Sequence, residues 1–152
     1  MFKRILLATD GSGHSKEALK YARDLALSGD ARVFVVHAVS LVPVYPGEPW
    51  MPQNITDVYD RGKQLATRAV EELQQAGVEG IVEVLEGPPA DAILRVARIR
   101  ECDLIVMGCR GRGELTSLLL GSVSHRVLAH ARAPVLIVRA TEDEEAGQDS
   151  LT

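Results

Sequence analysis

Short apolar runs in this sequence alternate with longer segments in which apolar residues recur every three or four positions. Continuous apolar runs are typical of strands covered on both faces, and the longer spacing is typical of helices. The predicted strands are Arg4–Thr9, Ala31–Val39, Gly80–Leu85, Asp103–Met107 and Pro134–Arg139. The first predicted helix follows the turn at Asp10–Gly13. The other predicted helices are Ile55–Ala76, Ala90–Arg100 and Ser122–His130. This order predicts an α/β fold: one parallel sheet with right-handed crossovers and helices on both faces.

The length of 152 residues predicts one domain, over residues 1–140, followed by an acidic, disordered tail at 141–152. The net charge of -4 gives no overall positive electrostatic field that would attract nucleic acid. No apolar run approaches the ~20 residues of a membrane span. We interpret the apolar N-terminus as a first strand, not a signal peptide. Cys102 and Cys109 have no zinc-site spacing, and two free thiols predict a cytoplasmic protein.

Two loops follow predicted strands at positions where parallel sheets bind ligands. The first is Asp10–Gly13, in which Asp10 either binds a ligand or shapes the turn. The second runs from Gly108 to Ser122 and contains several glycines, which let backbone N–H groups approach an anion. The helix that starts at Ser122 adds free N–H groups and its dipole. The loop therefore predicts a phosphate site, with Arg110 and Arg112 as either ligand contacts or surface charges.

Two familiar phosphate-binding motifs do not fit. A P-loop needs GxxxxGK[ST], and the loop has no lysine. A dinucleotide fingerprint would start at Gly11 and Gly13, but Lys16 stands at its third glycine position. Four prolines exclude regular structure from Leu41–Asn54, which is either a surface flap or a partner site.

Over about residues 1–140 the sequence resembles the universal stress protein family. The nucleotide motif of that family, G-x2-G-x9-G-[ST], is matched by Gly108, Gly111, Gly121 and Ser122 without a gap. The opening strand followed by DGS is matched at Ala8–Ser12, and the family's ending is matched from Leu119 to Val138. The resemblance implies a single-domain, Rossmann-like sandwich of the adenine nucleotide alpha hydrolase type. It has a five-stranded parallel sheet in the order 3-2-1-4-5.

The resemblance also implies an adenine nucleotide site and its residues. Gly108, Gly111, Gly121 and Ser122 would line the phosphates and ribose, and Val123 and Ser124 would extend the anion site. Asp10 would lie near the ribose or phosphates, with Ala8 and Thr9 beside the adenine. Val39 would contact adenine through its backbone, and Met107 would pack near the same pocket. Arg110 and Arg112, between the glycines, are further candidates. The ligand is ATP, or AMP or ADP, with Mg²⁺ held through the phosphates. The last strand, residues 134–139, would form a homodimer.

These residues leave three functions open. The first is a nucleotide-dependent regulatory module in a stress response, which an unknown partner protein reads. The second is an enzyme, at most a slow ATPase or phosphotransferase, for which Asp10 is the only nearby carboxylate placed at a strand end. The third is a structural adaptor without nucleotide, which the intact glycines disfavour. We expect the first, with no catalytic residue, no resident metal, no nucleic acid and no membrane as partner.

Overall fold

A computed structural model of the chain describes residues 1–41, 52–109 and 120–140. The strands are β1 (Arg4–Ala8), β2 (Arg32–Val39), β3 (Gly80–Glu86), β4 (Leu104–Gly108) and β5 (Val135–Val138). They form one five-stranded parallel sheet in the order β3-β2-β1-β4-β5. The predicted fold class and strand order are therefore confirmed. The tail at 141–152, predicted to be disordered, lies outside the described residues.

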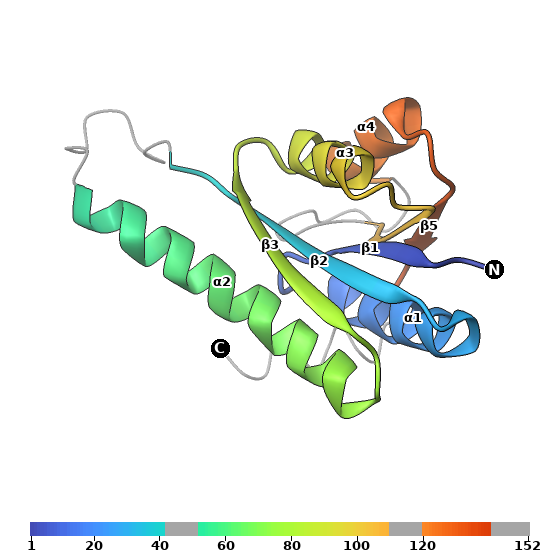
Figure 1. Cartoon of the computed structure of the whole chain (residues 1–152). Helices are drawn as coiled ribbons and strands as arrows, with labels where there is room; N and C mark the ends of the chain where they lie inside the picture. Colours follow the sequence, from blue (N-terminus) through green and yellow to red (C-terminus); the bar gives the residue numbers. More distant parts are fainter. Residues whose placement is uncertain (42–51, 110–119, 141–152) are drawn as a thin grey trace.

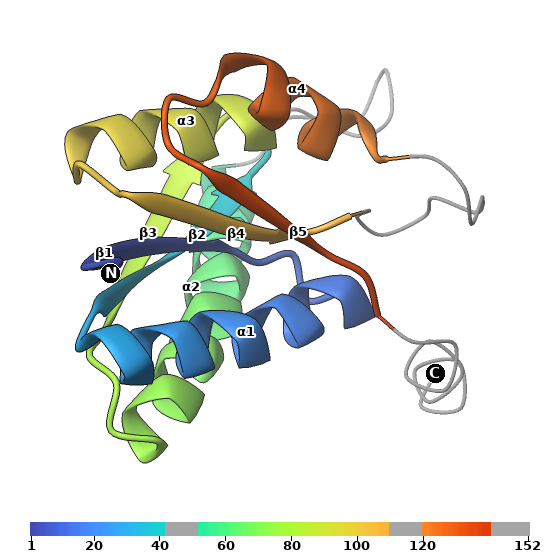
Figure 2. The same cartoon turned by 90° about the vertical axis from the view of Figure 1, so that its right-hand side faces the viewer.

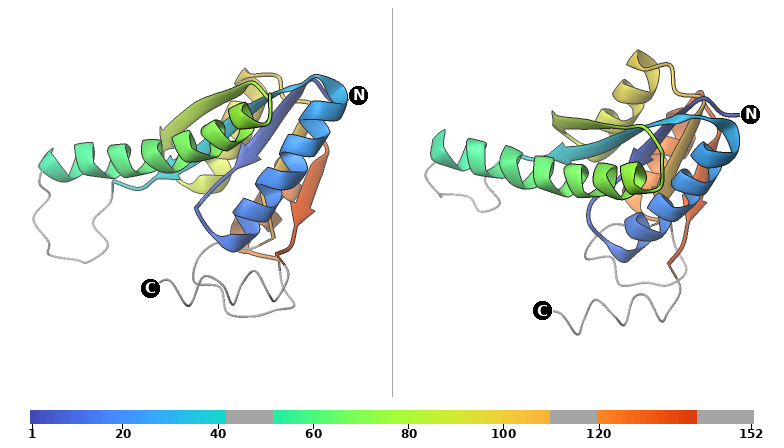
Figure 3. Two further views of the ribbon diagram at one scale, coloured as in Figure 1. Left: turned by 90° about the horizontal axis from the view of Figure 1, so that it is seen from below. Right: turned by 60° about the horizontal axis from the view of Figure 1, so that its bottom comes forward.

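Four helices sandwich the sheet (Figure 1). Helices α1 (Gly13–Gly29) and α2 (Pro52–Gln75) cover one face, and α3 (Pro89–Ile99) and α4 (Ser122–His130) cover the other. Figure 2 shows the three layers edge-on, with α3 and α4 above the sheet and α1 and α2 below it. In Figure 3, the N-terminal part of α2 extends past the sheet.

Each strand sends alternate side chains into two separate cores, because successive residues of a strand point to opposite faces. On the α1 and α2 face, the core contains Ile5, Leu7, Val33, Val35 and Val106. On the α3 and α4 face, it contains Leu6, Phe34, Val36, Ile105 and Met107. This is why the strands read as unbroken apolar runs: no face of the central strands is left for polar side chains.

Local signals place three of the helix ends. The Ser12 side chain caps α1 by accepting the N–H of Ser15 at 3.3 Å. Gly77 follows α2 with a φ of 86°, a left-handed conformation that suits glycine. Pro89 is the first residue of α3, where its missing N–H leaves no helical bond unmade.

Several predicted boundaries were wrong, most of them by one residue. Strand β1 ends at Ala8, not Thr9. Helix α2 begins at Pro52, although residues 52–54 were expected to be irregular. A proline breaks a helix from its interior but fits its first position, so Pro52 is compatible with the start of α2. None of the described helices is long and apolar enough to cross a bilayer.

The order in which successive strands are added to the sheet reverses at β1, and this places a crevice at the edge where the strands end. From β1 the chain crosses to β2 and β3 on one side, and β4 and β5 lie on the other side. At the carboxyl end of β1, neighbouring crossovers therefore diverge and leave room between them. Helices α1, α3 and α4 all begin at this edge because each follows a strand or the loop after it.

The buried thiol of Cys102 makes a prediction about alkaline stability. Burial raises its pKa from an ordinary 9.0 to about 12, and the Asp103 carboxylate adds to the effect. Because the folded-state pKa exceeds the unfolded one, the neutral thiol stabilises the fold below about pH 9. This stabilisation is lost as the pH rises towards about 12.

Between about pH 9 and pH 11, we expect the unfolding free energy to fall less steeply with pH in Cys102→Ala than in the unmodified protein. The difference in slope can reach ~1.4 kcal/mol per pH unit. Urea denaturation across this range measures it, with each variant normalised to its own value at neutral pH to remove the cost of the truncated side chain. Parallel curves for the two proteins would contradict this assignment.

Candidate functional site

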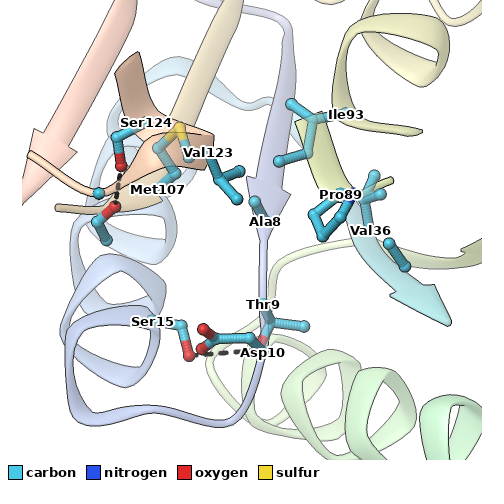
Figure 4. A pocket seen from close by; sticks show the side chains of 13 residues that line it. Ala8, Thr9, Asp10, Ser15, Val36, Pro89, Ile93, Met107, Val123 and Ser124 are labelled. Atoms are coloured by element: carbon cyan, nitrogen blue, oxygen red, sulfur yellow. Dashed lines mark hydrogen bonds between the residues drawn. The ribbon is translucent and has the colours of Figure 1, made fainter. Parts of the chain in front are cut away.

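A cavity of about 270 Å³ opens where β1 and β4 end (Figure 4). The described residues that line it come from β1, β2, β4, the start of α1, the start of α3 and the start of α4. They are Ala8, Thr9, Asp10, Ser15, Val36, Ala38, Pro89, Ile93, Met107, Gly108, Gly121, Val123 and Ser124. The volume is just below the ~300 Å³ at which small-molecule sites begin, and residues 110–119 lie outside the described part of the loop beside it.

The lining is divided into an apolar wall and a polar end. Val36, Pro89, Ile93, Met107 and Val123 form the wall, and the first two lie on the opposite side of β1 from the last two in Figure 4. The polar end contains hydroxyl, carboxylate and backbone groups of Thr9, Asp10, Ser15, Gly108, Gly121 and Ser124. Such a cavity suits a ligand with one flat apolar part and one polar or charged part.

Asp10 both shapes its turn and faces the cavity. Its Oδ1 accepts the N–H of Ser12 at 2.9 Å, which closes the turn after β1. Ser12 in turn caps α1, and the Ser15 hydroxyl donates to the Ser12 carbonyl at 2.9 Å. None of the described residues donates to the other oxygen of Asp10, Oδ2. The carboxylate is therefore held in place through Oδ1.

The two ends of the glycine-rich loop are tied together by hydrogen bonds. The Cys109 carbonyl accepts the N–H of Gly121 at 2.8 Å. The Ser124 hydroxyl lies 2.9 Å from the Gly108 carbonyl and 3.1 Å from the Cys109 carbonyl, and it shares its proton between them. The Ser124 hydroxyl hydrogen therefore closes the loop, and only the lone pairs of that oxygen and the backbone remain for a ligand.

Gly108 is needed by the packing of α1 as well as by the cavity. A Cβ at this position would lie 2.6 Å from the Cβ of His14 and 2.9 Å from its carbonyl carbon. His14 is buried and accepts the Ala140 N–H on Nδ1 at 2.8 Å. The Cys109 sulfur, also buried, lies 3.5 Å from the same nitrogen. The ends of β4 and β5 thus meet the start of α1 at His14.

The helix starts around the cavity differ in what they can bind. In α4, the N–H groups of Ser122, Val123 and Ser124 belong to the first turn and have no partner within the helix. They and the helix dipole favour an anion at that end. In α3, Pro88 and Pro89 stand at the N-cap and first position and have no N–H to offer. The α3 side of the cavity is therefore apolar.

Most of the predicted site residues lie together at this cavity. Its lining includes Ala8, Thr9, Asp10, Met107, Gly108, Gly121, Val123 and Ser124. Ser122 is exposed at the start of α4 and is not part of the lining. Arg110, Gly111 and Arg112 lie outside the described residues.

Val39 is not among the described residues that line the cavity. Its side chain is buried on the α2 face, where Cγ1 would be 2.7 Å from a Cβ added to Gly62. Its carbonyl accepts the N–H of Gly87. The residues of β2 that line the cavity are Val36 and Ala38. A backbone contact between Val39 and a ligand stays a prediction.

Five lining residues were not identified from the sequence: Ser15, Val36, Ala38, Pro89 and Ile93. The period of two along β2 could have separated Val36 and Ala38 from His37 and Val39. Pro89 and Ile93 are one helical turn apart at the start of a helix that follows a strand, so topology could have placed them at this edge. Within the described ranges, no three His, Cys, Asp or Glu side chains gather as metal ligands would.

Comparison with known proteins gives a consistent result. The family model described as "Universal stress protein family" matches residues 1–139. A universal stress protein of Thermus aquaticus is 43% identical over 139 residues, which cover 91% of this chain and 100% of the relative. The universal stress protein MJ0531 of Methanocaldococcus jannaschii is 37% identical, over 95% of this chain and 86% of the relative.

Solved structures agree with the fold. The protein MJ0577 superposes with a TM-score of 0.82 at 26% identity, over 93% of this chain and 99% of that one. A universal stress protein crystallised in complex with cAMP superposes with a TM-score of 0.67 at 26% identity, over 92% of this chain and 99% of that one. From the family match, the relatives and the shared sheet order, the chain belongs to the universal stress protein family.

Proposed function

We propose that the chain binds an adenine nucleotide in the cavity at the end of β1 and β4, with ATP as the ligand. The observation that supports it most is that one cavity combines an apolar wall with a helix start whose first N–H groups have no partner within the helix. A purine is flat and apolar on its faces, and its phosphates are anionic, so the two halves of the ligand match the two halves of the lining. The cAMP complex of a relative is consistent with this match.

The polarity of the lining gives the ligand a direction. The base lies against Val36, Pro89 and Ile93, because these lining side chains are apolar and the two prolines remove the first two N–H groups at the start of α3. The phosphates lie towards Gly121 and the first turn of α4, whose N–H groups would donate to them. Gly111 and the arginines at 110 and 112 belong to the intervening loop and would extend the phosphate site.

Asp10 faces the same cavity and would contact the ribose or the phosphates. A carboxylate near phosphates is repelled unless a cation lies between them. Oδ2, to which no described residue donates, is therefore suited either to a ribose hydroxyl or to Mg²⁺ carried by the nucleotide. In this role Asp10 binds and orients the ligand, without acting as a nucleophile.

The biological role we propose is a cytoplasmic regulatory module. A ligand that binds only the folded form stabilises it. Nucleotide at this site would tie together β1, β4, α1 and α4, whose ends form the cavity. A partner protein could read the resulting surface in a stress response.

Binding is tested with purified protein and ATP-Mg²⁺. ATP at about 100 times its Kd is expected to raise the unfolding free energy by ~2.7 kcal/mol. Gly121→Val is expected to abolish this stabilisation, because the new side chain would enter the cavity at its phosphate end. Thermal melts and isothermal calorimetry measure the two effects, and AMP in place of ATP shows how much the β- and γ-phosphates contribute.

Gly77→Ala is the matched control. Gly77 has a φ of 86° and lies far from the cavity lining, and an added Cβ meets nothing within 4 Å. Alanine there should cost stability through its strained backbone, but the shift on adding ATP should persist. Failure of the unmodified protein to respond to any adenine nucleotide would refute the proposed function.

The same family resemblance suggests a homodimer through β5, which is an edge strand. The Ile105 N–H donates to the Pro134 carbonyl, and the Cys109 N–H donates to the Val138 carbonyl. In a parallel ladder, residues 134, 136 and 138 therefore direct their backbone groups to β4, and residues 135 and 137 direct theirs outward. An outward row of this kind can pair with a second copy of the strand.

Ile137→Pro tests this interface. Proline removes the outward N–H at residue 137 without removing a bond to β4. Sedimentation velocity is expected to show a dimer for the unmodified chain and a monomer for the variant, with a similar circular dichroism spectrum. An unchanged dimer would exclude pairing along β5.

A further inference from the structure

His37 makes a hydrogen bond to the backbone of the candidate site from outside the cavity. It lies on β2 between Val36 and Ala38, which line the cavity, but its side chain is on the α2 face. Its Nδ1 lies 2.8 Å from the Thr9 carbonyl oxygen. A carbonyl can only accept, so Nδ1 carries the proton and donates it.

This bond stands where the β1–β2 ladder stops. The Thr9 N–H still donates to the Val36 carbonyl at 2.9 Å, as a parallel ladder requires. In a continued ladder the Thr9 carbonyl would next accept a backbone N–H of β2. It accepts the His37 side chain instead, and β1 ends at Ala8. Both peptide groups of Thr9 are therefore fixed by β2 while the chain turns away towards Asp10.

Helix α2 holds the imidazole against Thr9. Gly62 is buried at this contact, and a Cβ there would lie 2.8 Å from the Cδ2 of His37 and 2.7 Å from the Cγ1 of Val39. Only a glycine lets the helix approach β2 so closely. The ring is thus packed between α2 and the backbone that carries Asp10.

We propose that His37 is a positioning residue for the nucleotide site and that α2 sets its position. Through the Thr9 carbonyl, His37 fixes the peptide that leads into Asp10, and thereby the direction of the carboxylate and of the Asp10–Ser12 turn. A displacement of α2 near Gly62 moves the ring and loosens the turn. Affinity for nucleotide is then coupled to the docking of a helix that has no described residue in the cavity lining. The proposal rests on the proposed function for its ligand, but not for its effect on the turn.

The first test compares two substitutions of equal size. Asparagine places an amide N–H on Cγ, close to the position of Nδ1, whereas leucine has the same shape without a donor. We expect His37→Asn to keep the Kd for ATP within about twofold. We expect His37→Leu to weaken it about five- to tenfold, which corresponds to the loss of one hydrogen bond.

A second readout needs no nucleotide. The Ser12 N–H donates to Asp10 Oδ1 in the turn, so its hydrogen exchange reports how well the turn is held. By NMR, His37→Leu is expected to speed this exchange about tenfold and His37→Asn to leave it nearly unchanged. Chemical denaturation of both variants separates this local effect from a change in global stability.

The second pair of variants adds a methyl group at two places where α2 packs against the sheet. Gly62→Ala crowds His37, whereas Gly80→Ala crowds Val70 and Leu73 at the other end of the same helix, with contacts of 3.1–3.3 Å. Both should alter stability, but only Gly62→Ala should speed Ser12 exchange and weaken ATP binding. In a His37→Leu background, Gly62→Ala should add less than about a twofold further loss, because the shared bond is already gone.

The outcomes are distinct. Equal behaviour of the Asn and Leu variants, in exchange and in affinity, would overturn the role of His37. Equal effects of Gly62→Ala and Gly80→Ala, or additive effects of Gly62→Ala and His37→Leu, would overturn the link to α2. If the unmodified chain binds no adenine nucleotide, the proposed function fails, while Ser12 exchange in the four variants still decides the positioning role.

Discussion

The candidate site depends on where β1 stops pairing with its neighbours. Up to Ala8 the strand is bonded to β2 on one side and β4 on the other, and its side chains fill both cores. At Thr9 one bond to the β2 backbone remains, and the carbonyl turns to the His37 side chain. The next residue can then leave the sheet and face a cavity, because the hydrogen-bonding groups before it are already satisfied.

Packing and ligand binding make overlapping demands on the same small residues. Gly108 allows α1 to approach β4, and the same residue lines the cavity. Ser124 closes the loop with its hydroxyl hydrogen while its backbone lies in the first turn of α4. A glycine motif at such a site is therefore not purely a ligand signature, since part of the pattern would be required by the fold with no nucleotide bound.

The sequence predicted the layers, the parallel sheet and most of the cavity lining, because buried runs and helix periods are local patterns. It did not assign Val36 and Ala38 to the cavity, since the period of two separates the faces of a strand covered on both sides but does not show which face borders a cavity. It also missed the α3 wall of Pro89 and Ile93, which depends on a crossover packing over the end of β1. Pro52 was misread because a proline both ends irregular segments and begins helices.

His37 shows why such second-layer contacts escape a reading of motifs. As a residue within an apolar run it looks like an ordinary strand position, and as a histidine it invites an acid–base role. The proposed role follows instead from two distances on opposite sides of the ring, to the Thr9 carbonyl and to the position that a Cβ would take on Gly62. Because α2 lies on the face opposite the apolar wall, the sheet separates the cavity from the helix, and a side chain that forms a hydrogen bond at the edge of the sheet can connect the two. Coupling of this kind needs no movement of the sheet, only a helix whose approach is limited by a single glycine.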